Sequence, residues 1–386
     1  MILSHKIALD PTYKQREYFA RAAGTARFVW NLALARWKEL YLAGKQPSAA
    51  MLKAEFNTTK YELYPWLGGI HRDAHAEPFM NLGKAFTAFF KGTAKYPRFK
   101  SKKRSRDSFY VANDKFRTDG KRIRLPVIGL VRMRESLRFV GKITGAVVSR
   151  ECGRWSVAIQ VDVGDYSRPR VANGAVGIDL GLTTFAMLSD GTTVVAPKPL
   201  RHSLRRLRIR QRSLSRRGVG SSNREKQRRV VAKTHARITN IRCDFVQKFT
   251  TRVCRENQAI GVESLNVAGM VRNRKLSRAI SDVAWGETLR QFDYKAVIFG
   301  CALRVADRFE PSSKRCHVCG LVKKSLALSE RTFTCDGCGS VCDRDLNAAL
   351  NLVPLADGNL RLGRLPAAAV AEPGTTPRAQ ALVLTK

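Results

Sequence analysis

The sequence predicts a mixed α/β protein built from several domains. With 386 residues the chain is long enough for two or three domains, each with a core of its own. Apolar residues recur at helical spacing over much of residues 12–95, whereas residues 108–163 contain alternating, β-branched runs typical of strands. Two closely spaced cysteine pairs near the C-terminal end indicate a small metal-bound module.

The charge of the chain identifies the class of partner. Lys and Arg number 70 against 31 Asp and Glu, a formal net charge of +39. Such an excess predicts a large polyanion, and nucleic acid is the leading candidate. No run approaches the ~18 apolar residues of a membrane-spanning helix. The polar start, "MILSHKIALDPTYK", argues against a signal peptide, so we expect an intracellular protein whose nine cysteines bind metal or stay reduced.

The N-terminal half begins with a strand-like run and continues with helical segments. Aromatic residues of the second segment, Phe79 and Phe86 among them, fit a helical core best. Residues 95–106 are strongly basic and carry the candidate contacts Lys100, Lys102 and Lys103. This segment is either a solvated loop or, with its interleaved aromatic residues, a site for phosphate contact and base stacking.

Residues 200–256 read as a helical hairpin that follows a strongly apolar strand region. The first helix carries eight arginines with almost no acid to balance them. Charged helix faces are usually just solvated, but they are normally mixed in sign, so phosphate binding is favoured here. The candidate contacts are Arg201, Arg205, Arg208, Arg212 and Arg216.

Four cysteines form the pattern C-x2-C-x15-C-x2-C. They are Cys316, Cys319, Cys335 and Cys338. This spacing is typical of a four-cysteine zinc site, and four thiolates close the coordination shell. A closed shell leaves no place for a reactive water, so we expect a structural zinc ion rather than a catalytic one.

Three carboxylates stand in unusual places for so basic a chain. Asp179 lies within the apolar run "AVGIDLGL", Glu263 ends "AIGVESL", and Asp343 or Asp345 opens a C-terminal helix. Each has an ordinary explanation, as a turn former, a strand-end charge or a helix N-cap. Taken together, two strand acids and one helix acid resemble the ribonuclease H-like arrangement, in which carboxylates hold two Mg²⁺ ions for phosphodiester hydrolysis.

The ordered motifs resemble the TnpB family, the compact RuvC-type nucleases of insertion sequences that are related to type V CRISPR effectors. The specific motifs are "GIDLGLTTFAMLSDG", "IGVESLNVAGM", "FEPSSKRCHVCG", "FTCDGCG" and "DRDLNAALNL". The resemblance spans about residues 174–353 and is looser before that. It implies an RNA-guided DNA endonuclease whose guide derives from a transposon-end transcript, acting on double-stranded DNA beside a short target-adjacent motif. The oligomeric state is left open, with a monomer favoured.

The same resemblance assigns the site and the domains. Asp179, Glu263 and Asp345 become the ligands of two Mg²⁺ or Mn²⁺ ions, with Asp345 preferred over Asp343 because it fits D-x-N-A-A. Residues 1–168 would form a wedge-like β-barrel with a helical recognition insert at about 12–95. A RuvC-like, RNase H-like nuclease domain would take residues 169–310 and 342–353, a zinc ribbon 311–341 and a disordered tail 354–386.

Three other functions fit the same residues. The chain could be an RNA-guided DNA-binding regulator that does not cut, since binding requires no catalytic metal. It could be a guide-independent transposase that uses the same fold and metals. It could also be a compact CRISPR effector, which differs only in the source of its guide.

Overall fold

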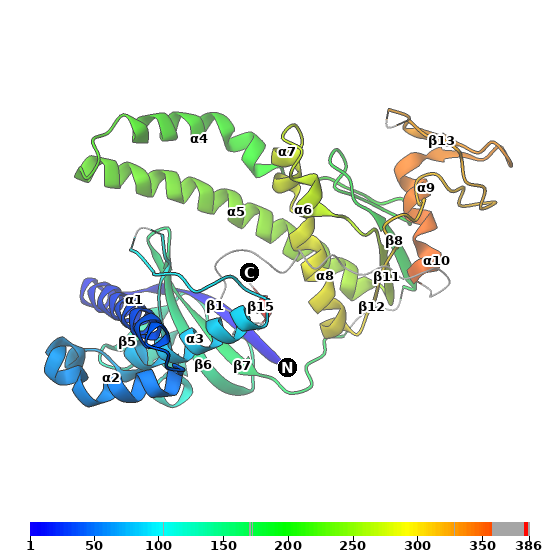
Figure 1. Ribbon diagram of the computed structural model, residues 1–386. Coiled ribbons are helices and arrows are strands. Elements are labelled where there is room, and N and C mark those ends of the chain that lie inside the picture. Colours follow the sequence, from blue (N-terminus) through cyan, green and yellow to red (C-terminus); the bar gives the residue numbers. More distant parts are fainter. Residues whose placement is uncertain (103, 170, 172, 328, 357–381, 385–386) are drawn as a thin grey trace. The chain divides into compact units, whose positions relative to one another are not determined.

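The computed structural model describes the chain except for residues 103, 170, 172, 328, 357–381 and 385–386 (Figure 1). The described residues divide into two compact units. The first comprises Met1–Asp165 with the short strand β15 (Leu382–Leu384), and the second begins at Tyr166. No helix in the described part of the chain is long and apolar enough to span a membrane.

Three long helices of the first unit share one aromatic core. They are α1 (Tyr13–Leu42), α2 (Ala49–Leu63) and α3 (Arg72–Phe90). A reciprocal capping box starts α1, because Thr12 accepts the Gln15 N–H while the Gln15 side chain accepts that of Thr12. Trp37 stacks on Phe86 at 4.0 Å between ring centroids. The helical core predicted around Phe79 and Phe86 is confirmed.

The strands of the first unit form a sheet with the order β2-β6-β7-β1-β5-β4-β3. Their bounds are β1 (Ile2–Asp10), β2 (Asp107–Ala112), β3 (Arg117–Asp119), β4 (Arg122–Leu125), β5 (Gly129–Met133), β6 (Lys142–Glu151) and β7 (Arg154–Asp162). Single 3₁₀ turns occupy η1 (Pro65–Gly69) and η2 (Asn113–Lys115).

The barrel predicted for residues 1–168 is not closed. The end strands β2 and β3 do not pair with each other in the described part of the chain. Strand β1 pairs with β7 through Ile2–Ala8 and with β5 only at Leu9 and Asp10, so β5 joins the sheet through two residue pairs.

The second unit contains a five-stranded sheet with the order β10-β9-β8-β11-β12. The bounds are β8 (Ala175–Asp179), β9 (Ala186–Leu188), β10 (Thr193–Val194), β11 (Ala259–Val262) and β12 (Ala302–Val305). Strands β8, β11 and β12 are parallel, whereas β9 is antiparallel to β8 and β10 is antiparallel to β9. The carboxyl ends of β8 and β11 therefore lie at one edge of the sheet.

Helix α9 (Arg344–Asn351) and the short α10 (Val353–Ala356) cover this sheet at close range. Two glycines permit the approach. A Cβ on Gly177 would lie 1.9 Å from the Ala349 carbonyl oxygen, and one on Gly261 would lie 2.1 Å from that of Leu352. No side chain fits such a space, so both positions require glycine.

The other helices of this unit are α4 (Pro199–Ser215), α5 (Ser222–Glu256), α6 (Val267–Met270), α7 (Ser277–Val283) and α8 (Trp285–Phe299), of which α4 and α5 are the longest. Helices α4 and α5 occupy the segment expected to form the hairpin, and Figure 1 shows them side by side, joined by a short loop. A separate two-stranded sheet, β13 (Thr332–Thr334) with β14 (Val341–Asp343), precedes α9.

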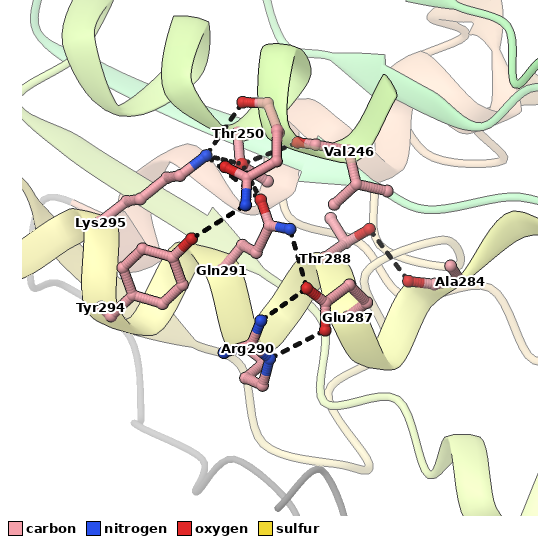
Figure 2. Close-up of polar contacts among 10 residues, drawn as sticks. Val246, Thr250, Ala284, Glu287, Thr288, Arg290, Gln291, Tyr294 and Lys295 are labelled. Carbon is pink, nitrogen blue, oxygen red and sulfur yellow. Dashed lines mark hydrogen bonds and ion pairs between the residues drawn. The ribbon is translucent and has the colours of Figure 1, made fainter. Parts of the chain in front are cut away.

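A buried polar network joins α5 to α8 (Figure 2). The Lys295 ammonium group donates to the Gln247 carbonyl oxygen at 2.9 Å and to the hydroxyls of Thr250 and Thr251 at 2.8 Å. Burial lowers the pKa of Lys295 to about 7. Gln291, also fully buried, accepts from Thr250 and donates to Glu287. The network satisfies polar groups that burial would otherwise leave without partners.

Two segments of the tail that was expected to be disordered from residue 354 form secondary structure. Val353–Ala356 form α10, and Leu382–Leu384 form β15, parallel to β1. Residues 357–381, the rest of the expected tail apart from 385–386, lie outside the described residues.

Candidate active site and metal centre

Two of the predicted acids lie side by side at one edge of the second sheet. Asp179 is the last residue of β8, and Glu263 directly follows β11. The two strands are parallel neighbours with Ile178 opposite Val262, so the next residue of each strand is its acid. The Ser312 hydroxyl donates to the Glu263 carboxylate at 2.5 Å. The fold thus fixes both carboxylates through the register of two strands.

The third acid, Asp345, reaches the same edge from α9. It lies in the first turn of that helix, whose backbone packs on β8 at Gly177. Loss of water around Asp179, followed by the nearby carboxylates of Glu263 and Asp345, raises the pKa of Asp179 to about 8. Three carboxylates from two strands and a helix therefore share one electrostatic site, here called the acidic site.

Asp343, the competitor of Asp345, has a different contact. Its carboxylate accepts the backbone N–H groups of Asp345 and Leu346 at 2.9 and 3.0 Å, which makes it the N-cap of α9. Asp345 makes no such capping bond and lies 4.0 Å from the Arg331 guanidinium. Asp343 also acts on Asp179 less strongly than Asp345 does.

The four predicted cysteines converge. All four sulfur atoms lie within 4.8 Å of one another, with Cys316 and Cys338 at 3.7 Å and Cys319 and Cys335 at 3.5 Å. Four sulfurs at ~2.3 Å from one zinc ion would lie ~3.8 Å apart, whereas a disulfide needs ~2.0 Å. The geometry fits a tetrahedral zinc ion. Among the described residues, these four are the only group of three or more potential ligands whose atoms lie close enough to share a metal ion, so the three carboxylates do not form such a cluster.

Cys335 is the cysteine of this cluster whose surroundings favour the thiolate that zinc requires, whereas the neighbouring cysteine sulfurs raise the pKa of Cys338. Backbone N–H groups of Cys338 and Gly337 lower the pKa of Cys335 to about 6. Phe333 packs, fully buried, against Cys316 and Cys335. His317 is not part of the sulfur cluster, because its Nδ1 lies 3.0 Å from Asn347 Oδ1 instead.

Two asparagines of α9 tie this helix to the cysteine module. Asn347 and Asn351 both donate from Nδ2 to the Arg315 carbonyl oxygen at 2.7 Å, directly before the first cysteine. Asn351 also donates to the Ser312 carbonyl oxygen at 2.8 Å. Sequence reasoning assigned no role to Ser312 or to these asparagines, although each lies within one of the motifs above. The cysteine module is thereby connected to both Glu263 and Asp345.

The predicted arginine face of α4 is exposed. Arg201, Arg205, Arg208, Arg212 and Arg216 are all exposed, and none pairs with a carboxylate among the described residues. A groove of about 620 Å³ lies between α4 and α5, where other cations collect. These are Arg206, Arg210, Lys233 and Arg237, with His202 beside them. Arg206 and Arg210 belong to the eight arginines that the sequence placed on the first helix, whereas Lys233 and Arg237 come from α5 and were not predicted.

The basic segment of the first unit divides into different environments. Lys100 lies over the Trp30 ring at 3.8 Å, and burial lowers its pKa to about 8. Lys102 is exposed, and Lys103 lies outside the described residues. Tyr96 packs edge-on against Phe89 at 5.2 Å. Lys100 and Tyr96 therefore take part in the packing of this unit.

Comparison with known proteins adds three family matches. A helix-turn-helix domain model matches residues 1–46, a model described as "Probable transposase" matches 158–274, and a Cas12f1-like TNB domain model matches 285–352. Among solved structures, the fold is similar to Cas12f1 in a complex with sgRNA and target DNA. The TM-score is 0.54 at 14% identity, over 89% of this chain and 83% of that one.

Two relatives align over almost their whole length. A Streptomyces pristinaespiralis protein named "Putative RNA-guided DNA endonuclease" is 39% identical, covering 90% of this chain and 88% of its own. Escherichia coli (strain K12) "Putative RNA-guided DNA endonuclease InsQ" is 32% identical, covering 93% and 94%. Fold, cysteine module and matches define a transposon-encoded protein with a fold similar to that of Cas12f1. The chain belongs to the TnpB family.

Proposed function

We propose that this chain is an RNA-guided DNA endonuclease of a transposable element, which cuts target DNA next to a short target-adjacent motif. The observation that carries the proposal is the acidic site, where Asp179, Glu263 and Asp345 meet at the edge of a parallel sheet. The names of both relatives support it. So does the charge of +39, which suits a protein that holds RNA and DNA together.

We propose that the acidic site holds two Mg²⁺ or Mn²⁺ ions. Carboxylate oxygens are the ligands that these ions prefer. Without a cation, burial and then repulsion from Glu263 and Asp345 raise the pKa of Asp179, so a bound cation would favour its charged form. When bound, such ions stabilise the charge that develops on a phosphodiester and lower the pKa of an attacking water.

The chain's own groups keep these ligands in place. The Ser312 hydroxyl holds one oxygen of Glu263, and so restricts how that carboxylate can turn. Asp343 caps α9 and fixes the first turn in which Asp345 lies. Asn347 and Asn351 bind α9 to the segment before Cys316. We assign the zinc ribbon a positioning role, with a structural Zn²⁺ on Cys316, Cys319, Cys335 and Cys338.

The domain roles follow from this assignment. We propose that residues 169–310 and 342–353 act as the RuvC-like nuclease, with residues 311–341 as the ribbon. The first unit would read the target-adjacent motif, and a transcript of the transposon end would supply scaffold and guide. The exposed arginines of α4 would contact phosphates.

The test is purification followed by cleavage. The protein is produced together with the transcribed ends of its own element, and the RNA that co-purifies is sequenced. We expect one RNA species that ends in a guide, and cutting of plasmids complementary to it in Mg²⁺. The Asp179→Ala complex should bind the same RNA and plasmid without cutting. Absence of a defined RNA, or undiminished cutting by Asp179→Ala, would contradict the proposal.

A further inference from the structure

One side of strand β1 in the first unit is only partly covered by its neighbour in the sheet. On the opposite side, β1 pairs with β7 through Ile2–Ala8 in unbroken register. On this side β5 takes only Leu9 and Asp10, and the Arg134 N–H donates to the Ala8 carbonyl oxygen at 2.9 Å. The rest of this side, residues Ile2–Ile7, is not covered by β5, and we call it the outer edge of β1.

The C-terminal end of the chain occupies the outer edge of β1. Strand β15 runs parallel to β1, and its register places Leu382 opposite Leu3 and Leu384 opposite His5 (Figure 1). The β1 residues in this contact are buried, with at most 3% of each exposed. The sequence of β15, Leu-Val-Leu, has the apolar and β-branched composition of a strand. A segment far away in the sequence therefore supplies the partner that β5 does not.

The outer edge of β1 lacks the usual features that discourage strand pairing. A regular edge offers its N–H and C=O groups to any incoming strand, and natural sheets protect such edges with proline, bulges or charge. The sequence "ILSHKI" contains no proline, and its register on β7 shows no shift. Its one lysine, Lys6, donates to Glu151 at 2.9 Å. Without β15 this edge would accept another strand.

The two end strands of the same sheet are protected in other ways. Side chains of α3 cover β2, because the Asp73 carboxylate accepts the Ala112 N–H at 2.8 Å. His71 Nε2 also lies 2.9 Å from the Tyr110 carbonyl oxygen. Strand β3 is three residues long, with the sequence RTD, so it is short and charged at both ends. β15 therefore protects β1 as side chains protect β2 and as charge protects β3.

The covalent connection favours β15 over a strand from another molecule. Three residue pairs make a small contact, and a free tripeptide would bind there weakly. Residues 357–381 connect α10 to β15, so the pairing is intramolecular. A tethered segment competes at an effective concentration of up to ~mM, well above that of a second protein molecule in dilute solution.

We propose that the outer edge of β1 is a strand-addition surface whose occupant is the chain's own segment 382–384, and that this occupant prevents two copies of the chain from pairing edge to edge. The strand that would otherwise bind is β1 of a second copy, because two identical edges can pair about a twofold axis. The inference does not depend on the proposed function, since no residue of the acidic site takes part.

The test uses the full-length chain in ~1 M salt, where a screening length of ~3 Å weakens the repulsion between positively charged copies. Val383→Pro with Leu384→Pro removes two neighbouring N–H donors. One of them faces β1, because successive N–H groups of a strand point to opposite sides. Val383→Thr with Leu384→Ile is the matched control, which keeps both donors and the strand propensity. Hydrogen exchange of residues 2–7 and the molar mass at sedimentation equilibrium are measured for each protein.

We expect the proline variant to exchange hydrogen faster at the outer edge of β1 and to self-associate at least about tenfold more tightly than the wild type. The peptide ALVLTK, which is residues 381–386, should return this variant to a monomer when added in excess. The peptide ALPPTK, which carries the same two prolines, should not. The threonine and isoleucine control should resemble the wild type in both measurements.

Three results would overturn the inference. Unchanged hydrogen exchange in the proline variant would mean that β15 does not cover β1 in solution. Faster exchange in a variant that stays monomeric would mean that the uncovered edge does not pair with a second copy. Self-association that ALVLTK does not reverse would place the contact between copies on another surface. A wild-type complex that never cuts a complementary target would count against the proposed function alone.

Discussion

Gly177 and Gly261 lie opposite each other on adjacent parallel strands, and the backbone of the α9–α10 segment passes directly over both. This contact determines how far Asp345 lies from Asp179 and Glu263, because α9 carries Asp345 in its first turn. The two glycines therefore control the distances among Asp179, Glu263 and Asp345.

Gly177→Ala should abolish guided cleavage and destabilise the second unit. The new Cβ would lie 1.9 Å from the Ala349 carbonyl oxygen, so either α9 or β8 must move. Overpacking of this kind costs about 1–3 kcal/mol of unfolding free energy. Gly286→Ala is the matched control, because its Cβ would meet only Val267 at 3.9 Å. Denaturant unfolding and plasmid cleavage together check this, and full activity of Gly177→Ala would contradict the packing argument.

Substitution by serine should separate the two aspartates at the start of α9. Serine can replace Asp343 as an N-cap, so Asp343→Ser should cut nearly as well as the wild type. Asp345→Ser should lose cleavage and keep its stability and its guide RNA. Asp343→Ala, which loses the cap, should be destabilised by about 1 kcal/mol. An active Asp345→Ser beside an inactive Asp343→Ser would reverse the assignment.

Asp179→Ala and Glu263→Gln should both stop cleavage while guide binding continues. Each removes an oxygen ligand proposed for the metal ions, and neither residue lies on the basic surfaces. Ser312→Ala should have a smaller effect, since it removes only the hydrogen bond that orients Glu263. The measurement is the cleavage rate at increasing Mg²⁺ concentration. Ser312→Ala should require more Mg²⁺ than the wild type and reach a similar maximal rate.

Replacing Cys316 or Cys338 with Ser should release the one zinc ion that a closed four-thiolate shell holds. Cleavage should fall too, because Asn347 and Asn351 anchor α9 to the residues just before Cys316. Cys342→Ser is the control, since its sulfur lies outside the cluster. Metal analysis of the purified proteins decides the matter. A zinc-free wild-type protein from zinc-replete cells would rule the site out.

Much of the site could be predicted from sequence because its residues sit in unusual local contexts. Asp179 in an apolar strand and the cysteine spacing are visible in a single chain. The role of Asn347 was not visible, because its partner, the Arg315 carbonyl oxygen, lies 32 residues away. The open sheet of the first unit depends on where β1 changes partners, which strand propensity does not encode.

Buried Lys295 should make the stability of the protein depend on pH. Its folded-state pKa of about 7 lies below its ordinary value of 10.5, so between these limits the unfolded chain binds more protons than the folded one. Stability therefore rises with pH across this window, by up to about 1.4 kcal/mol per pH unit. Lys295→Met should lose this rise in denaturant unfolding measured from pH 7 to 10. If the stability of the variant and of the wild type changed with pH in the same way, Lys295 would stay charged in the folded protein among the oxygen atoms to which it donates.

The arginine face of α4 should control affinity without affecting sequence choice. Arg205, Arg208 and Arg212 are exposed and have no carboxylate partner among the described residues, so replacing all three with Gln should leave stability unchanged. Phosphate contacts carry no sequence information, so every guide should bind more weakly to the same degree. The slope of log affinity against log salt should shrink by ~0.7–0.9 for each phosphate that is no longer neutralised.

A second triple variant shows which arginine surface is used. Arg206, Arg210 and Arg237 line the groove between α4 and α5, and Arg210 also donates to the Thr234 hydroxyl. Replacing these three should lower the stability of the protein as well as its affinity for nucleic acid. Only the variant at Arg205, Arg208 and Arg212, called the outer triple, therefore tests charge without a change in packing. Preference for the target-adjacent motif should stay constant in both, because we place its recognition in the first unit. An unchanged salt slope in the outer triple would mean that this face is solvated surface, and that the α4–α5 groove holds the nucleic acid.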